Sequence, residues 1–101
     1  MSGFELVVRP EVDADLREAE MWYERQRPGL GAEFLRKVHK SMSSLPDNPF
    51  RHPVRDRRFQ VRWSYPWPFP YRIVYRVLQD TVVIYTVVHS ARHEHHWQKR
   101  V

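Results

Sequence analysis

Residues 11–46 read EVDADLREAEMWYERQRPGLGAEFLRKVHKSMSSLP, and two stretches of helical spacing within them decide the fold. In the first stretch the apolar side chains that share one helical face are Val12, Leu16, Ala19 and Tyr23. In the second stretch the intervals of three and four join Phe34, Leu35, Val38, Met42 and Leu45. A break at residues 28–31 separates the two stretches, and Pro46 and Pro49 end the second. The pattern predicts an antiparallel pair of amphipathic helices whose apolar faces must pack on a sheet.

Alternating stretches on both sides of these helices predict that sheet. FELVVR (4–9) precedes the helices, and RRFQVRW (57–63), YRIVYRVL (71–78) and TVVIYTVV (81–88) follow them. The connections between the last three stretches are short, which favours antiparallel neighbours. The predicted fold is therefore α+β, in the order β-α-α-β-β-β, with a helical hairpin packed on an antiparallel sheet. A chain of 101 residues suits one domain over residues 1–101.

Charge is unevenly distributed along the chain. Residues 1–50 hold seven Lys/Arg and nine Asp/Glu, a net of −2, whereas residues 51–101 hold ten and three, a net of +7. A basic C-terminal half favours an acidic partner, either a nucleic acid or an acidic protein segment. The chain has no cysteine, which excludes disulfide scaffolds and thiol catalysis. It also has no long apolar run, so we expect a cytoplasmic protein that does not bind membranes.

The histidine-rich segment HSARHEHHWQKR (89–100) raises the question of a metal site. His93-Glu94 begins like the zinc motif H-E-x-x-H, but Trp97 occupies the place of the second histidine. His89, His93 and His96 would share a face only if the segment were helical, and the sequence marks no carboxylate partner for them. We therefore expect neither a metal nor another cofactor.

RNA cleavage is a second chemistry that this composition permits. It needs a proton carrier, which histidine provides near neutral pH, and cations that stabilise the phosphorane. Arg72 and Arg76 share one face of their strand because their spacing is even. If that face points away from the helices, Arg58 and Arg62 can join it from the next strand. The alternative is a solvated sheet face on which arginines only maintain solubility.

Four motifs resemble the RelE/ParE superfamily, the toxins of type II toxin–antitoxin modules that are often called plasmid-stabilisation proteins. They are Asp15-Leu16-x-Glu18-Ala19-x-x-Trp22-Tyr23-Glu24, Pro28-Gly29-Leu30-Gly31-x-x-Phe34, Phe69-Pro70-Tyr71-Arg72-Ile73-x-Tyr75 and His89-x-x-Arg92-x-x-x-x-Trp97. The resemblance covers roughly residues 5–100 and implies the same β-α-α-β-β-β fold. It also implies growth inhibition that a cognate antitoxin protein neutralises.

The resemblance leaves the target open between two branches. ParE-like members inhibit DNA gyrase, and RelE-like members cut mRNA on the ribosome. The helical hairpin and the terminal motif resemble the ParE-like branch more, so gyrase is the first expectation and a ribosome-dependent mRNA endoribonuclease the alternative. A non-toxic basic RNA-binding module is a third, more distant alternative.

The resemblance also supplies candidate site residues. Arg72 and Arg92 match positions where RelE-like nucleases hold phosphate, but the tyrosine that those nucleases place after the second arginine is not matched. A histidine would have to carry the proton, and His89 is the first candidate. The catalytic candidates are thus Arg92, Arg72 and His89, and the candidates for target or RNA binding are Arg58, Arg62, Arg76, His93, His96 and Trp97. Of these, Trp97 is also expected to pack against the end of the sheet and anchor the tail.

Overall fold

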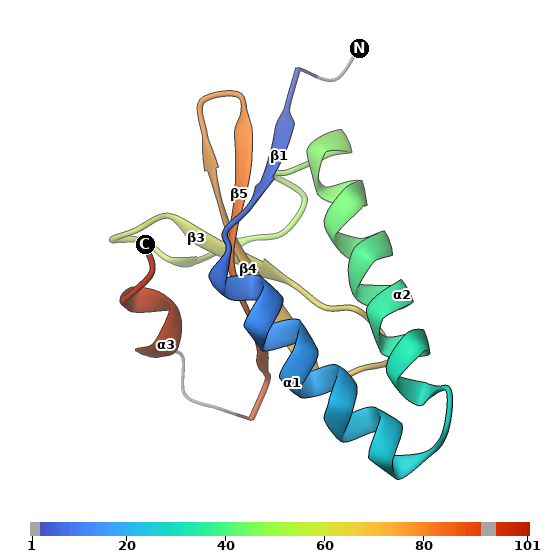
Figure 1. Ribbon diagram of the computed structural model, residues 1–101. Helices are drawn as coiled ribbons and strands as arrows, with labels where there is room; N and C mark the ends of the chain where they lie inside the picture. The colour runs from blue at the N-terminus through green and yellow to red at the C-terminus, as the bar shows by residue number, and fades with distance from the viewer. Residues whose placement is uncertain (1–2, 92–94) are drawn as a thin grey trace.

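The computed structural model describes residues 3–91 and 95–101. Two long helices lie side by side on one face of a five-stranded sheet, and a short third helix lies near the C-terminus (Figure 1). The elements are β1 (Glu5–Val8), α1 (Glu11–Gln26), α2 (Leu30–Ser44), a 3-10 turn (Leu45–Asp47), β2 (Val54–Asp56), β3 (Val61–Ser64), β4 (Tyr71–Leu78), β5 (Thr81–His89) and α3 (His95–Gln98). This is the α+β architecture that the sequence predicts.

The order of strands in the sheet is β1-β5-β4-β3-β2. The last four strands pair antiparallel, as expected, whereas β1 runs parallel to β5, with Glu5 opposite Thr81 and Val8 opposite Ile84. The pair is parallel because the helical hairpin follows β1 in the sequence and carries the chain back across one face of the sheet to the remaining strands. β1 ends at Val8, so among the residues that the structure describes β5 has no strand neighbour on that side beyond Ile84.

The strand predicted over residues 57–63 is shorter than expected and has a partner that the sequence pattern missed. β3 begins only at Val61, because residues 57–60 form a turn in which Gln60 adopts a positive φ of 55°. The backbone N–H of Phe59 donates to Oδ1 of Asp56 at 3.0 Å, which fixes this turn. β2, only three residues long, pairs with β3 across the turn and forms the sheet edge.

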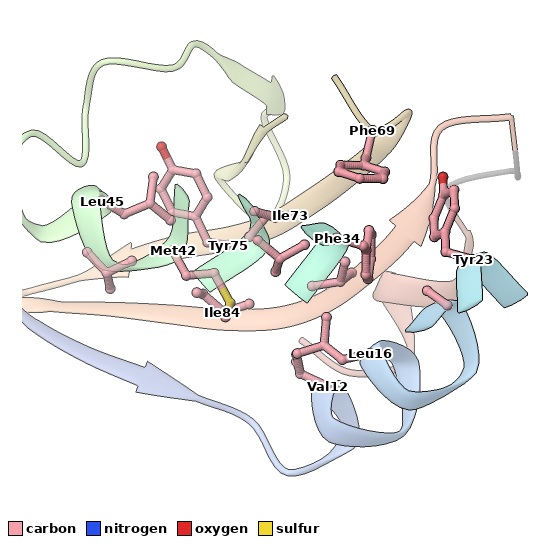
Figure 2. Packing of buried hydrophobic residues seen from close by; sticks show 14 residues of the cluster. Val12, Leu16, Tyr23, Phe34, Met42, Leu45, Phe69, Ile73, Tyr75 and Ile84 are labelled. Atoms are coloured by element: carbon pink, nitrogen blue, oxygen red, sulfur yellow. The ribbon is translucent and has the colours of Figure 1, made fainter. Parts of the chain in front are cut away.

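The helical hairpin packs its apolar stripe on the sheet as predicted. The main buried cluster contains Val12, Leu16, Ala19, Tyr23, Phe34, Val38, Met42 and Leu45 from the helical segment, with Phe69, Ile73, Tyr75, Val82, Ile84 and Val87 from the sheet side, and partly buried Leu35 packs against it. The ring of Phe34 lies 5.2 Å from that of Tyr23 and 5.3 Å from that of Phe69, measured between centroids (Figure 2). Aromatic packing therefore joins both helices to the start of β4.

The connection between α1 and α2 depends on two glycines. Gly29 precedes α2 with φ of 89°, a conformation that a side chain disfavours. A Cβ on Gly31 would lie 2.8 Å from the backbone oxygen of Glu20, so only glycine allows the two helices to approach this closely. Glu24 closes the turn, because its carboxylate accepts the backbone N–H groups of both glycines.

A second buried cluster lies on the face of the sheet away from the two long helices. It consists of Val61, Trp63, Val74, Val88 and Trp97, with Phe59 and Val101 partly buried against it. Trp97 is only 2% exposed, and its ring centroid lies 5.9 Å from that of Phe59. The expectation that Trp97 anchors the tail on the sheet is confirmed. The C-terminal segment thus covers part of a face that the periodicity alone assigned to solvent.

Candidate functional site

Arg72 and Arg76 lie on the face of β4 away from the long helices. Their neighbour on the same face, Val74, belongs to the second cluster, whereas Ile73 and Tyr75 between them belong to the helix-side cluster. Both arginines are half-buried, and the Cζ atom of Arg72 lies 4.8 Å from the ring centroid of Trp63. The face that Arg72 and Arg76 share therefore points away from the helices, which is the condition that the sequence analysis set for Arg58 and Arg62 to join it.

His89 lies on the other face. It stands opposite Tyr71 in the β4–β5 register, and their ring centroids are 5.2 Å apart on the side of the long helices. Arg72 instead stands opposite Val88, on the side of the second cluster. The sheet therefore separates His89 from Arg72, and the two do not converge on one phosphate.

The imidazole of His89 is also engaged locally. Its Nδ1 accepts the backbone N–H of Ala91 at 3.0 Å, so the neutral ring carries its proton on Nε2. The lone pair that a general base would use is therefore occupied by the backbone. In this geometry Nε2 is the ring nitrogen that can donate a hydrogen bond.

Arg62 does not join Arg72 and Arg76, contrary to the expectation for the basic face. It stands opposite Tyr75 in the β3–β4 register and so lies on the helix side of the sheet. Its Nη1 donates to the backbone oxygen of His52, and it lies 3.4 Å from the backbone oxygen of Phe50. Arg62 therefore holds the segment before β2 in place.

The remaining candidates divide between a turn and the tail. Arg58 is exposed in the turn after β2, where its Cζ lies 5.0 Å from the ring centroid of Phe59. Arg92 and His93 lie outside the described residues, as does the side chain of His96. The roles expected of these three stay predictions.

A cleft between α1 and the end of β5 was not expected from the sequence. Its volume is about 660 Å³, and its wall includes Trp22, Tyr71 and His89. Asp15 and Arg100 form one end of it. The cleft exists because β1 stops at Val8, which leaves the last residues of β5 facing α1 instead of another strand.

Asp15 takes the place of a strand partner at this end of β5. Its Oδ2 accepts the backbone N–H of Val87 at 3.1 Å and the hydroxyl of Thr86 at 2.9 Å. Arg100 donates to both carboxylate oxygens, at 2.6 and 3.1 Å, and to the backbone oxygen of Tyr85 at 3.0 Å. This network, the Asp15–Arg100 clamp, fastens the C-terminal tail to α1 and β5. Its hydrogen bond to Asp15 raises the pKa of Arg100.

The helical spacing does not predict a contact between Asp15 and the sheet. One signal did exist, because Asp15 opens the first motif shared with the RelE/ParE superfamily. Its partner Arg100, however, lies 85 positions further along the chain and belongs to no motif.

The ring of buried Tyr75 lies near that of partly buried His52, with the ring centroids 6.3 Å apart. The Tyr75 hydroxyl donates to the backbone oxygen of Pro49 at 2.8 Å, and burial raises the pKa of Tyr75 to about 12. Burial lowers the pKa of His52, and the charges of Arg51, Arg55 and Arg62 lower it further. The charges of three arginines thus act on the segment before β2.

The raised pKa of Tyr75 predicts a loss of stability at high pH. Between pH 10 and about 12, tyrosine ionises in the unfolded chain but stays protonated in the folded one. The unfolded state then binds fewer protons, so the free energy of unfolding must fall as the pH rises through this window. Urea unfolding at a series of pH values measures the slope. Tyr75→Phe should make the slope shallower, and an unchanged slope in that variant would contradict the assignment.

Within residues 3–91 and 95–101, no three side chains of His, Cys, Asp or Glu are grouped so that they could hold a metal ion. In the same part of the chain, no helix combines the length and the apolar character that crossing a bilayer requires.

Comparison with known proteins supplies the context for this geometry. Residues 6–94 match the family model described as the ParE toxin of the type II toxin–antitoxin system parDE. A search of curated protein sequences gave no match. Among solved structures, one described as the chromosomal ParDE toxin–antitoxin system from P. aeruginosa is similar in fold, with a TM-score of 0.70 at 15% identity. The similarity covers 88% of this chain and 98% of that chain.

The family match covers most of the chain, and the structural match supports the same fold independently of sequence. Members of a toxin–antitoxin system act with an antitoxin protein as their partner, and the third alternative of a non-toxic RNA-binding module loses its basis. The chain belongs to the ParE toxin family of type II toxin–antitoxin systems.

Proposed function

We propose that this toxin inhibits growth by acting on DNA gyrase, in the cytoplasm, until its antitoxin neutralises it. The observation that carries the choice of target is the separation of Arg72 from His89 by the sheet. A nuclease that uses an arginine to hold phosphate needs its proton carrier within hydrogen-bond reach of the same phosphate. The ParE family match supports the same choice, because the ParE-like branch is the one associated with gyrase.

The alternative of mRNA cleavage makes a different demand on the same residues. It would require the tail around Arg92 to supply both a cation and a proton carrier on the Arg72 face. His89 is unsuited to that role, because its Nδ1 is bonded to the backbone of Ala91 and its ring lies on the opposite face.

His89→Ala tests whether His89 transfers a proton, and two assays of the variant and the wild type separate the targets. If gyrase is the target, we expect the variant to inhibit supercoiling by purified gyrase within a few-fold of the wild type, because no proton transfer is lost. A nuclease that used His89 as an acid or base would lose about 10²–10⁴-fold in cleavage rate. The measurements are a supercoiling assay and mapping of mRNA 5′ ends after toxin expression. Codon-dependent mRNA cleavage with unimpaired supercoiling would reject gyrase as the target.

A further inference from the structure

Four exposed arginines lie within eight residues at the edge of the sheet, around β2. We call them the edge arginines: Arg51 precedes this strand, Arg55 lies in it, and Arg57 and Arg58 follow it. β2 is the last strand in the sheet order, so no strand of the described part of the chain covers them. Among residues 3–91 and 95–101, no carboxylate forms an ion pair with any of the four.

The local charge is almost entirely of one sign. Between positions 51 and 62 the sequence contains five arginines and a single carboxylate, Asp56. That carboxylate already accepts the backbone N–H of Phe59 at 3.0 Å. The lowered pKa of His52, to which Arg51 and Arg55 contribute after burial, is a second sign of a positive potential at this edge.

Two of the edge arginines are held in place by aromatic rings. The Cζ of Arg55 lies 5.6 Å from the ring centroid of Trp63, and that of Arg58 lies 5.0 Å from the ring centroid of Phe59. A guanidinium that rests on a ring keeps its in-plane N–H groups available for a ligand. Such an arginine loses little freedom when it grips a phosphate in the bidentate manner.

The chemistry of this edge favours a phosphate backbone over a protein segment. Apart from Phe50, which is 57% exposed next to Arg51, the exposed residues of this edge are Arg51, Pro53, Arg55, Arg57, Arg58 and Gln60, so an acidic peptide would find little apolar surface to bury. Contacts to a nucleic-acid backbone need only cations at suitable spacing. The neighbouring Arg62 is not available, because its guanidinium is bonded to the backbone at His52.

We propose that the edge arginines form a sequence-independent binding surface for the phosphate backbone of duplex DNA. The choice of DNA over RNA rests on the proposed function, since gyrase holds duplex DNA and a toxin on gyrase would meet it. The surface would retain the toxin on the DNA that its target is processing.

Fluorescence anisotropy of a labelled duplex of random sequence, titrated with the full-length toxin, tests this proposal. Four phosphate contacts give a slope of log K against log salt of about −3.6, which is roughly a hundredfold loss of affinity from 50 to 200 mM salt. Arg55→Gln, Arg57→Gln and Arg58→Gln together should make that slope shallower by about 2.7. The matched control removes three exposed charges from α2 with Arg36→Gln, Lys37→Gln and Lys40→Gln and should leave the slope unchanged.

A second measurement uses His52, which lies between Arg51 and Arg55 in the sequence. The pKa of His52, followed by NMR, should rise when DNA screens Arg51 and Arg55, and it should not rise with DNA in the triple variant. Thermal unfolding of both triple variants checks that each is folded.

Three results would overturn the inference. Unchanged DNA binding in the triple variant would mean that the edge arginines only keep an edge strand from pairing with other chains. Equal losses in the control would mean that net charge alone attracts DNA. Tighter binding to duplex or single-stranded RNA at the same salt would assign the surface to RNA. The supercoiling assay stays separate, because gyrase inhibition without DNA binding refutes only this surface, and DNA binding without gyrase inhibition refutes only the proposed target.

Discussion

Phe34→Ala should lower the free energy of unfolding by about 3–5 kcal/mol. Phe34 has no exposed surface, and its ring contacts Tyr23, Phe69 and Tyr71 at centroid distances of 5.0–5.3 Å. Alanine would leave a cavity between these three rings, two of which, Tyr23 and Phe69, are seen beside Phe34 in Figure 2. Urea unfolding followed by tryptophan fluorescence gives the change in free energy.

Phe50→Ala is the matched control for this prediction. It removes the same side chain from a position that is 57% exposed, so the loss should be about 1 kcal/mol or less. Similar losses at positions 34 and 50 would mean that the helical hairpin does not pack on the sheet through Phe34.

Asp15→Ala should lower the free energy of unfolding by about 3 kcal/mol, at the low end of the range for removing one partner of a buried ion pair. The Asp15 and Arg100 side chains are 17% and 24% exposed, so the loss falls short of that for a fully buried pair. The substitution removes the carboxylate that accepts from the Thr86 hydroxyl and the Val87 N–H. Among the described residues, it leaves the Arg100 guanidinium only the Tyr85 backbone oxygen and the Thr86 hydroxyl as acceptors. At roughly 4–8 °C per kcal/mol, the melting temperature should fall by more than about 10 °C.

A double-mutant cycle shows whether this loss belongs to the Asp15–Arg100 clamp. Arg100→Ala in the Asp15→Ala background should cost far less than in the wild type, because its main partner is already gone. Asp13→Ala is the control, since Asp13 forms an exposed ion pair with Arg17 and should cost about 0.5 kcal/mol or less. Additive losses at positions 15 and 100 would contradict the clamp.

Periodicity predicted the helices and their buried faces because each stripe depends only on residues within one helix. The stripe from Val12 to Tyr23 and the one from Phe34 to Leu45 are both buried where the spacing places them. The family motifs predicted the fold in the same way, since their spacing reflects the same turns and contacts. Local patterns of this kind need no knowledge of distant parts of the chain.

The faces of the sheet could not be predicted in full, because they depend on register between strands. Alternation shows which residues of its own strand share a face with Arg62. It does not show which residues of β4 lie on that face. The turn at residues 57–60 sets a register in which Val61 and Trp63 pack with Val74 on the outer face, and Arg62 then lies opposite Tyr75. A shift of one residue would reverse this result. His89 was separated from Arg72 for the same reason.

The parallel pairing of β1 with β5 has a consequence for the order in which the chain can fold. Residues 5–8 find their strand partners only at positions 81–84, so β1 cannot join the sheet until most of the chain has left the ribosome. The helical hairpin, in contrast, forms from neighbouring residues and can assemble early. A truncated product that ends before β5 would lack Val82, Ile84 and Val87, which cover the two helices from the centre of the sheet, and would be a substrate for proteases rather than a partial toxin. Synthesis of the last strand is thus the step that commits the polypeptide to its native state.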